Sequence, residues 1–294
     1  MKRLHLIDGT WELFRQHFSK RPSHRAPDGR DLKATVGVAG NLLGMLQSES
    51  DPVTHIAVAF DNPIESFRNR LWAGYKTSEG VPPELLAQFD EVEAAVTALG
   101  IAVWSMKEWE CDDALCAGAR RWRDDFDEVV ICSPDKDLGQ CVEDERIVQL
   151  DRLRDKRLDE AAILALRGIP PRAIPDWLAL VGDTADGYPG LPGFGEKSAT
   201  AVLAAFGSLE KIPDDAARWP KTVRGADKLA ATLAARREEA MLFRKLATLV
   251  DDLPLPQSRA EELAWRGVPR EAFEAWCARA GARSLLERVR RWRD

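Results

Sequence analysis

Three carboxylates lie within four residues in the stretch WECDDALC (109–116), at Glu110, Asp112 and Asp113. A solvated acidic run usually continues into polar residues, but this chain continues as ALCAGA, which is small and apolar. If the segment is helical, Glu110 and Asp113 share a face because they are three residues apart. Negative charge is therefore concentrated where the chain enters a core, and it needs a compensating partner.

Further acids follow short apolar runs that are typical of buried strands. LHLI leads to Asp8, HIAVAF leads to Asp61, and VVICSP leads to Asp135 and Asp137. The carboxyl ends of parallel strands lie along one edge of a sheet, so these acids are expected to converge there with WECDDALC. A single acid at a strand end is most simply a turn or a helix cap, but a convergence of several is not explained that way.

Carboxylates gathered in this way repel one another by several kcal/mol unless a cation compensates them. Mg²⁺ and Mn²⁺ prefer oxygen ligands, and no cluster of His or Cys favours zinc. The stretch GDTADG adds Asp183 and Asp186 on a tight turn. The acids exceed what one ion needs. Two ions about 4 Å apart fit in-line phosphoryl transfer, in which one activates water and the other stabilises the leaving oxygen.

Two other segments are suited to binding phosphates. In LPGFGEKSATAVLAAFG, Gly193 and Gly195 let backbone amides approach a phosphate, and Lys197 and a helix N-terminus add positive charge. A plain turn is the alternative for this segment. FRNRLWAGYK combines positive charge with aromatic faces for stacking, and an amphipathic helix is its alternative. Its relevant residues are Arg68, Arg70, Trp72, Tyr75 and Lys76.

The elements that must position these residues fall into two parts. Buried strands are predicted at 4–7, 55–60, 101–104, 129–133 and 147–150, and helices at 32–47, 82–100 and 113–126. Their alternation predicts an α/β domain over residues 1–165, with a mostly parallel sheet flanked by helices. Strand patterns stop after about residue 165, and a helical module is predicted over residues 166–294.

Composition narrows the class of protein. The 294 residues are 45% hydrophobic and 31% charged, which supports a soluble chain with a real core. No run approaches the ~18 apolar residues of a membrane span, and the first apolar run is too short for a signal peptide. The five cysteines form no CxxC pair and are expected to be reduced thiols of a cytoplasmic protein.

The net charge of −6 argues at first against a polyanionic partner. Nine of the acids are the proposed metal ligands, and leaving them out changes the balance from −6 to +3. From Arg266 onward, eight arginines face four acids. The chain can therefore be acidic overall and still offer a basic face around a metal site.

Together these motifs resemble the 5′-nuclease superfamily, which includes flap endonucleases and the 5′→3′ exonuclease domain of bacterial DNA polymerase I. The motif order spans nearly the whole chain: LIDGT, AFD, FRxxLxxxYK, ExDD, DKDLxQ, GDxxDxxPGxxGxGEKxA and GS. The resemblance implies a PIN-like α/β fold with a helix-hairpin-helix module. It also implies that the metal-binding carboxylates are Asp8, Asp61, Glu110, Asp112, Asp113, Asp135, Asp137, Asp183 and Asp186.

The resemblance also assigns roles to single residues. Lys76 would help orient the scissile phosphate, and Tyr75 would stack on a nucleobase. The hairpin at 190–199 would bind duplex DNA and could hold a K⁺ ion. Among the WECDDALC acids, Glu110 and Asp112 are the first choices for direct metal contact. Asp113, expected to be shared with water, is still counted as catalytic, so Asp113→Asn should cost orders of magnitude in rate.

Three positions depart from the family pattern. Glu79 stands where the family often has an arginine, and it would repel a 5′ phosphate. Ala185 and Gly187 replace the serine and asparagine of the usual SDN, and Pro134 precedes DKD. None of these changes removes an acid, so an active enzyme is expected.

The expected activity is that of a structure-specific 5′ nuclease on branched or 5′-ended DNA, with RNA primers open as a further substrate. It would use two or three Mg²⁺ or Mn²⁺ ions and work as a monomer at the nucleoid. The length leaves no room for a polymerase domain, so a free-standing bacterial nuclease is expected. The alternatives are a PIN-type ribonuclease, which would not use the hairpin, and a non-catalytic binder of branched DNA.

Overall fold

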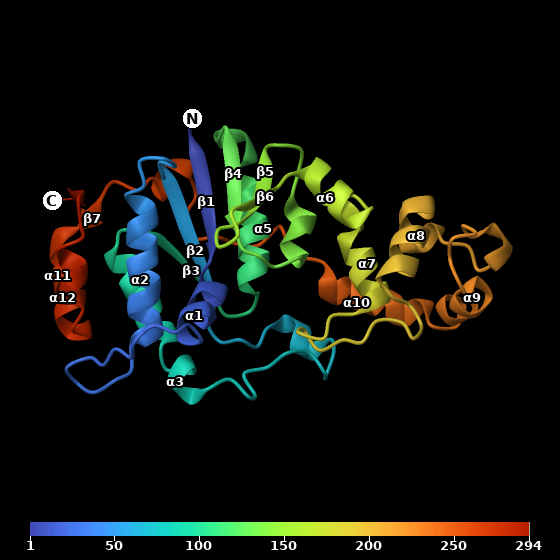
Figure 1. The fold of residues 1–294 in the computed structure, drawn as a ribbon, viewed down its shortest axis with the longest axis horizontal. Helices are drawn as coiled ribbons and strands as arrows, with labels where there is room; N and C mark the ends of the chain where they lie inside the picture. Colours follow the sequence, from blue (N-terminus) through green and yellow to red (C-terminus); the bar gives the residue numbers. More distant parts are fainter. Residues whose placement is uncertain (294) are drawn as a thin grey trace.

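The computed structural model describes residues 1–293. A six-stranded sheet of order β3-β2-β1-β4-β5-β6 lies at its centre (Figure 1), parallel except for the β5–β6 pair. The strands are β1 Arg3–Asp8, β2 His55–Asp61, β3 Ala102–Met106, β4 Glu128–Cys132, β5 Ile147–Asp151 and β6 Lys156–Leu158. The five predicted strands and the mostly parallel sheet are confirmed. The sequence does not predict β6, because its KRL has no apolar run.

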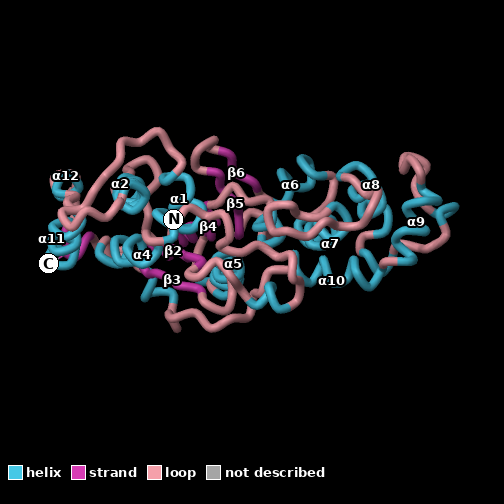
Figure 2. Tube along the Cα trace, turned by 90° about the horizontal axis from the view of Figure 1, so that it is seen from below, coloured by secondary structure: helices cyan, strands magenta, loops and turns pink. Residues whose placement is uncertain are grey.

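Alternate residues of the strands face two different cores. On β1, Ile7 joins the core that includes α2 and α4, whereas Leu4 and Leu6 join the core that includes α5. Figure 2 shows the sheet between α2 on one side and α5 on the other. The helices of this part are α1 Gly9–His17, α2 Lys33–Leu46, α3 Pro83–Leu86, α4 Phe89–Ala98 and α5 Cys111–Arg121.

The predicted helix at 82–100 is two helices, α3 and α4, with a break at Ala87 and Gln88. The Gln88 side chain is buried, and its Oε1 accepts the backbone N–H groups of Ala34 and Thr35 at the start of α2. These N–H groups have no partner within their own helix. Satisfying them draws Gln88 out of a continuous helix.

A second, helical part has its own core and lies beyond β6 in Figure 1. Four glycines with positive φ lie in the stretch between α7 and α8, as the helix-hairpin-helix pattern predicts: Gly182, Gly187, Gly190 and Gly193. The helices of this part are α6 Glu160–Arg167, α7 Ile174–Val181, α8 Glu196–Phe206, α9 Ala226–Ala235 and α10 Arg237–Ala247.

The last part of the chain returns to the α/β domain. Trp265, Phe273 and Trp276 are buried in the same core as α2 and α4. Figure 1 shows α11 (Arg270–Ala280) at the opposite end of the molecule from α9. The elements here are β7 Val268–Pro269, α11 Arg270–Ala280, α12 Arg283–Leu286 and β8 Trp292–Arg293. The structure therefore differs from a single helical module over 166–294, because the apolar face of α11 completes the first core. Among the described residues, no helix is long and apolar enough to cross a membrane.

Candidate metal and nucleic-acid site

The strand-end acids are tied together by short hydrogen bonds at one edge of the sheet. Asp8 Oδ1 accepts from the backbone N–H of Trp11 at 2.8 Å, which caps α1, and Oδ2 accepts from the Ser133 hydroxyl at 2.7 Å. Asp61 Oδ1 accepts from the N–H of Cys111 at 2.7 Å. These bonds join the end of β1 to the residue after β4, and the end of β2 to the start of α5, at the edge that the parallel sheet predicts.

A second group of acids comes from two segments, the DKD stretch after β4 and the GDTADG turn. One carboxylate oxygen each of Asp137, Asp183 and Asp186 lies within 4.8 Å of the others. Asp137 Oδ1 is buried and accepts no hydrogen bond. Oxygen donors that converge on one point, with a buried acceptor left over, suit a hard divalent cation. The residues present therefore fit the ion that the sequence predicts.

Burial makes several of these acids hard to ionise when no ion compensates them. It raises the pKa of Asp8 and of Asp137 to about 7, and that of Asp61 to about 6. The pKa of Asp112 is also raised, by burial and then by the charges of Asp135 and Asp8. Asp112 therefore faces the same charge cluster as the strand-end acids.

Glu110 is the exception, because two cations face it. Burial alone would raise its pKa, but the Lys76 ammonium and the Arg68 guanidinium lower it to about 2. Lys76 Nζ lies 2.8 Å from Glu110 Oε2 and 3.0 Å from Asp186 Oδ1. Its backbone N–H donates to the carbonyl oxygen of Asp186 at 3.0 Å. Lys76 therefore joins the two groups of acids at the position predicted for the phosphate-orienting lysine.

Asp113, predicted as a metal ligand and catalytic residue, has other partners in this geometry. Its carboxylate is fully buried and faces the Arg68 guanidinium through two 2.7 Å hydrogen bonds. Oδ1 also accepts from the N–H of Val250 at 2.8 Å, and Oδ2 accepts from the N–H of Glu110 at 3.0 Å. Both oxygens are thus already satisfied. Asp113 holds the start of α5 in place instead.

Two of the side chains predicted to contact DNA are buried in this structure. Arg68 is only 1% exposed, so its charge serves Asp113 and Glu110 rather than a phosphate. Tyr75 is 3% exposed, and its hydroxyl lies 3.2 Å from Glu110 Oε2, so its ring has no free face for a base. Arg70 is exposed at the surface and pairs with Glu108. The sequence shows charge and aromaticity in this segment but not which side chains turn inward.

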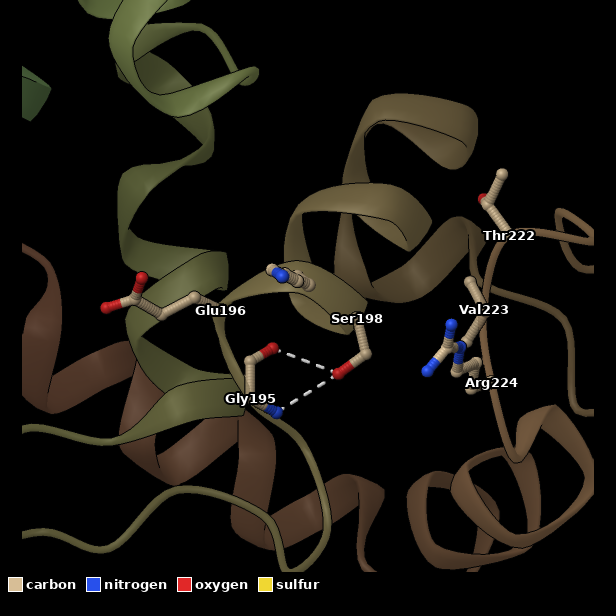
Figure 3. Close-up of a pocket in the computed structure, with 7 residues that line it drawn as sticks. Gly195, Glu196, Ser198, Thr222, Val223 and Arg224 are labelled. Carbon is tan, nitrogen blue, oxygen red and sulfur yellow. Dashed lines mark hydrogen bonds between the residues drawn. The ribbon is translucent and has the colours of Figure 1, made fainter.

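The hairpin forms one wall of an open groove at the start of α8. The groove has a volume of about 560 Å³ and runs between residues 195–198 and residues 222–224. Figure 3 shows Ser198 turned back onto Gly195, whose N–H and carbonyl oxygen it binds at 3.0 and 2.9 Å. Arg224 lies on the opposite wall of the groove, and the Glu196 side chain points away from Arg224 (Figure 3). Lys197 and Arg224 are both exposed.

Family comparisons agree with this architecture. Residues 3–167 match the model of the 5′-3′ exonuclease N-terminal resolvase-like domain, and residues 169–271 match the 5′-3′ exonuclease C-terminal SAM fold. The chain belongs to the 5′-3′ exonuclease family. Helices α7 to α10 of this family member lie in its SAM-like domain. The strand-end acids lie in its resolvase-like domain, whereas Asp183 and Asp186 belong to the SAM-like domain.

Curated relatives of this exonuclease-family chain are much longer proteins. DNA polymerase I of Pseudomonas aeruginosa is 34% identical over 85% of this chain and 27% of its own length. DNA polymerase I of Bacillus caldotenax is 32% identical over 98% of this chain and 32% of its own length. The chain thus spans about a third or less of these two relatives.

Solved structures share the fold at low sequence identity. The T5 D15 protein co-crystallised with metal ions has a TM-score of 0.66 at 15% identity, and covers 98% of this chain and 99% of its own. The catalytic core of Rad2 in complex with a DNA substrate has a TM-score of 0.61 at 14% identity, and covers 98% of this chain and 91% of its own.

The departure at Gly187 has a structural reason in this family member. Gly187 has a φ of +84°, and a Cβ at this position would lie 2.0 Å from the carbonyl oxygen of Gly74. An asparagine cannot fit while the two backbones remain this close. The contact also carries a 3.0 Å hydrogen bond from Trp72 Nε1 to the Gly187 oxygen. The two segments that bring Lys76 to Asp186 are therefore packed backbone to backbone.

Sequence reasoning missed two residues of the site. Ser133 donates to Asp8 and accepts the N–H of Asp135, so it fixes both acids, although nothing in its type announces this role. Lys136 Nζ donates to Asp183 and lies 3.2 Å from Asp137 Oδ1. Its only signal in the sequence is its place between the two acids of DKD, which does not by itself show where the side chain points.

Proposed function

We propose that this protein is a structure-specific 5′ nuclease that hydrolyses phosphodiester bonds in branched or 5′-ended DNA with two Mg²⁺ or Mn²⁺ ions. One observation carries the proposal: Lys76 lies between Glu110, at the start of α5 beside the strand-end acids, and Asp186 of the Asp137, Asp183 and Asp186 group. Divalent ions bound there would activate water and stabilise charge on the leaving oxygen. A solved structure of the T5 D15 flap endonuclease contains DNA and metal ions. That structure supports the proposal that the present protein also binds DNA and metal ions.

The position of each residue suggests which ion or group it would bind. Asp8, Asp61 and Asp112 would hold one ion, and Asp137, Asp183 and Asp186 would hold the other, with Glu110 and Asp135 beside them. The hydrogen bonds of Asp8 and Asp61 and the charges that face Asp112 support the first set, and the convergence of the other three carboxylates supports the second. Lys76 is suited to binding the scissile phosphate, since its ammonium lies between both acidic groups.

The groove at α8 is suited to binding the duplex. Lys197 and Arg224 offer positive charge from its two walls, and the backbone N–H groups at the start of α8 are suited to phosphate oxygens. Such contacts read the backbone and not the bases, so selectivity should come from DNA shape. We also propose a K⁺ ion at this hairpin, activity on RNA–DNA hybrids, a monomeric state, and work in the cytoplasm at the nucleoid.

A cleavage panel tests the function. Flap, nicked, gapped, single-stranded and RNA-primed substrates would be compared in Mg²⁺, Mn²⁺ and chelator, with Asp61→Asn as the matched inactive control. We expect metal-dependent cleavage of 5′-flap or nicked DNA that Asp61→Asn abolishes. Cleavage of single-stranded RNA alone would favour the PIN-type ribonuclease. Binding of flap DNA with no cleavage under any divalent ion would favour a non-catalytic binder.

A further inference from the structure

Lys136 occupies the place of a cation within the second group of acids. Its Nζ donates to Asp183 Oδ2 and lies 3.2 Å from Asp137 Oδ1. Asp137 Oδ1 nevertheless accepts no hydrogen bond, so the ammonium supplies charge there without an aligned donor. The ammonium offsets one negative charge of the two carboxylates and leaves one buried oxygen free for a better ligand.

The two lysines of the site are held very differently. Lys76 is fixed through its backbone, because its N–H donates to Asp186 and its carbonyl oxygen accepts from Asn69 at 2.9 Å. The Lys136 side chain is 38% exposed, and its ammonium pairs with Asp137 and Asp183 alone among the described residues. A flexible four-carbon stem at the surface can turn out to solvent at little cost. Lys136 can therefore leave the site at less cost than Lys76, whose backbone is held and whose side chain is 27% exposed.

We propose that Lys136 is a built-in counter-cation that holds the second metal site when no metal is bound and must swing out before an ion enters. The inference rests on the proposed function, because it takes Asp137, Asp183 and Asp186 as ligands. Ammonium and divalent ion compete for the same oxygen atoms, so the lysine lowers the apparent affinity for the second ion. In return it prevents these carboxylates from repelling one another in the metal-free protein.

Calorimetric titration with Mn²⁺ tests the competition without any measurement of cleavage. In Lys136→Met, the second ion should bind tighter, on the order of tenfold, because a positive charge no longer has to be displaced. Lys136→Arg keeps the charge and should stay near wild type. Lys156→Met removes one charge from the exposed β6 strand, and it should leave both binding steps unchanged.

The outcomes separate this inference from the proposed function. Fewer than two Mn²⁺ ions on the wild-type protein would reject the two-ion function and this inference together. Two ions on wild type, with unchanged second-ion affinity in Lys136→Met, would reject the role of Lys136 alone. In chelator, Lys136→Met should also unfold at a temperature a few degrees lower, and saturating Mn²⁺ should remove that difference.

A measurement on the wild-type chain keeps the proposal testable if Lys136→Met does not fold. An amine-reactive ester would be applied with and without Mg²⁺, and labelling at each lysine quantified by peptide mass spectrometry. Lys136 should become more reactive when Mg²⁺ is added, while Lys156 serves as the reference that does not change. Equal labelling of Lys136 in both conditions would contradict its displacement.

Discussion

The pair of Arg68 and Asp113 gives the sharpest test, because the structure and the family resemblance assign Asp113 opposite roles. The two side chains are 1% and 0% exposed and share two 2.7 Å hydrogen bonds. Arg68 also donates to the carbonyl oxygens of Leu246 and Thr248 at the end of α10, at 2.8 and 3.0 Å. The pair therefore fastens α5 to the helical part of the molecule.

Removing one partner of a buried ion pair typically costs about 3–5 kcal/mol, since it leaves the other charge uncompensated. Asp113→Asn should therefore lower the free energy of unfolding by several kcal/mol, and the unfolding temperature by roughly 10 °C. Arg68→Met should cost at least as much, because two carbonyl oxygens at the end of α10 also lose their donor. The double variant should lose less than the sum of the two single variants.

The assay is urea unfolding of each variant, once in chelator and once with saturating Mg²⁺. A structural role predicts the same loss for Asp113→Asn in both conditions. Asp61→Asn is the matched control: ionised Asp61 is disfavoured by burial, so in chelator this variant should be as stable as wild type or more stable, yet gain less from Mg²⁺. If Asp113→Asn instead behaves like Asp61→Asn, Asp113 is a metal ligand and the reasoning from its hydrogen bonds is refuted.

Three further outcomes are expected. Gly187→Ala should lower both the stability and the cleavage rate, because the new Cβ would lie 2.0 Å from the carbonyl oxygen of Gly74. Gly44→Ala is the control, since its Cβ would lie 4.0 Å from the nearest atom, on Arg288. The urea midpoints of the two variants check this prediction. Lys197→Glu should weaken duplex binding and reduce its salt dependence while leaving the saturated rate unchanged, and unchanged anisotropy titrations over a KCl series would count against it. Because burial raises the pKa of Asp8 and Asp137 to about 7, the metal-free protein should lose stability as the pH rises from about 4 to 7, and Mg²⁺ should bind the deprotonated form. The gap in unfolding temperature between Mg²⁺ and chelator should therefore widen from about pH 5.5 to about pH 8, and a constant gap would contradict the pKa argument.

Several features of this protein could be read from the sequence because they depend on local patterns. Apolar runs that end in Asp8 and Asp61 predict both the strands and the edge where the acids meet, since parallel strands end together. The glycine spacing at 193 and 195 predicts the hairpin, because a tight turn depends on the residues within it. Strand, helix and turn signals lie within a few residues of one another, and the long-range sheet geometry follows from their order.

What only the tertiary structure decided is which charged side chains face which. Asp112 and Asp113 are adjacent in sequence and chemically identical, yet helical geometry turns Asp112 toward the acidic edge and Asp113 into the buried guanidinium of Arg68. The same holds for Lys136, whose partners at 137 and 183 come from separate segments. Residue type fixes the chemistry that a side chain can perform. Burial and the partner across the fold fix whether it performs that chemistry or holds another residue in place.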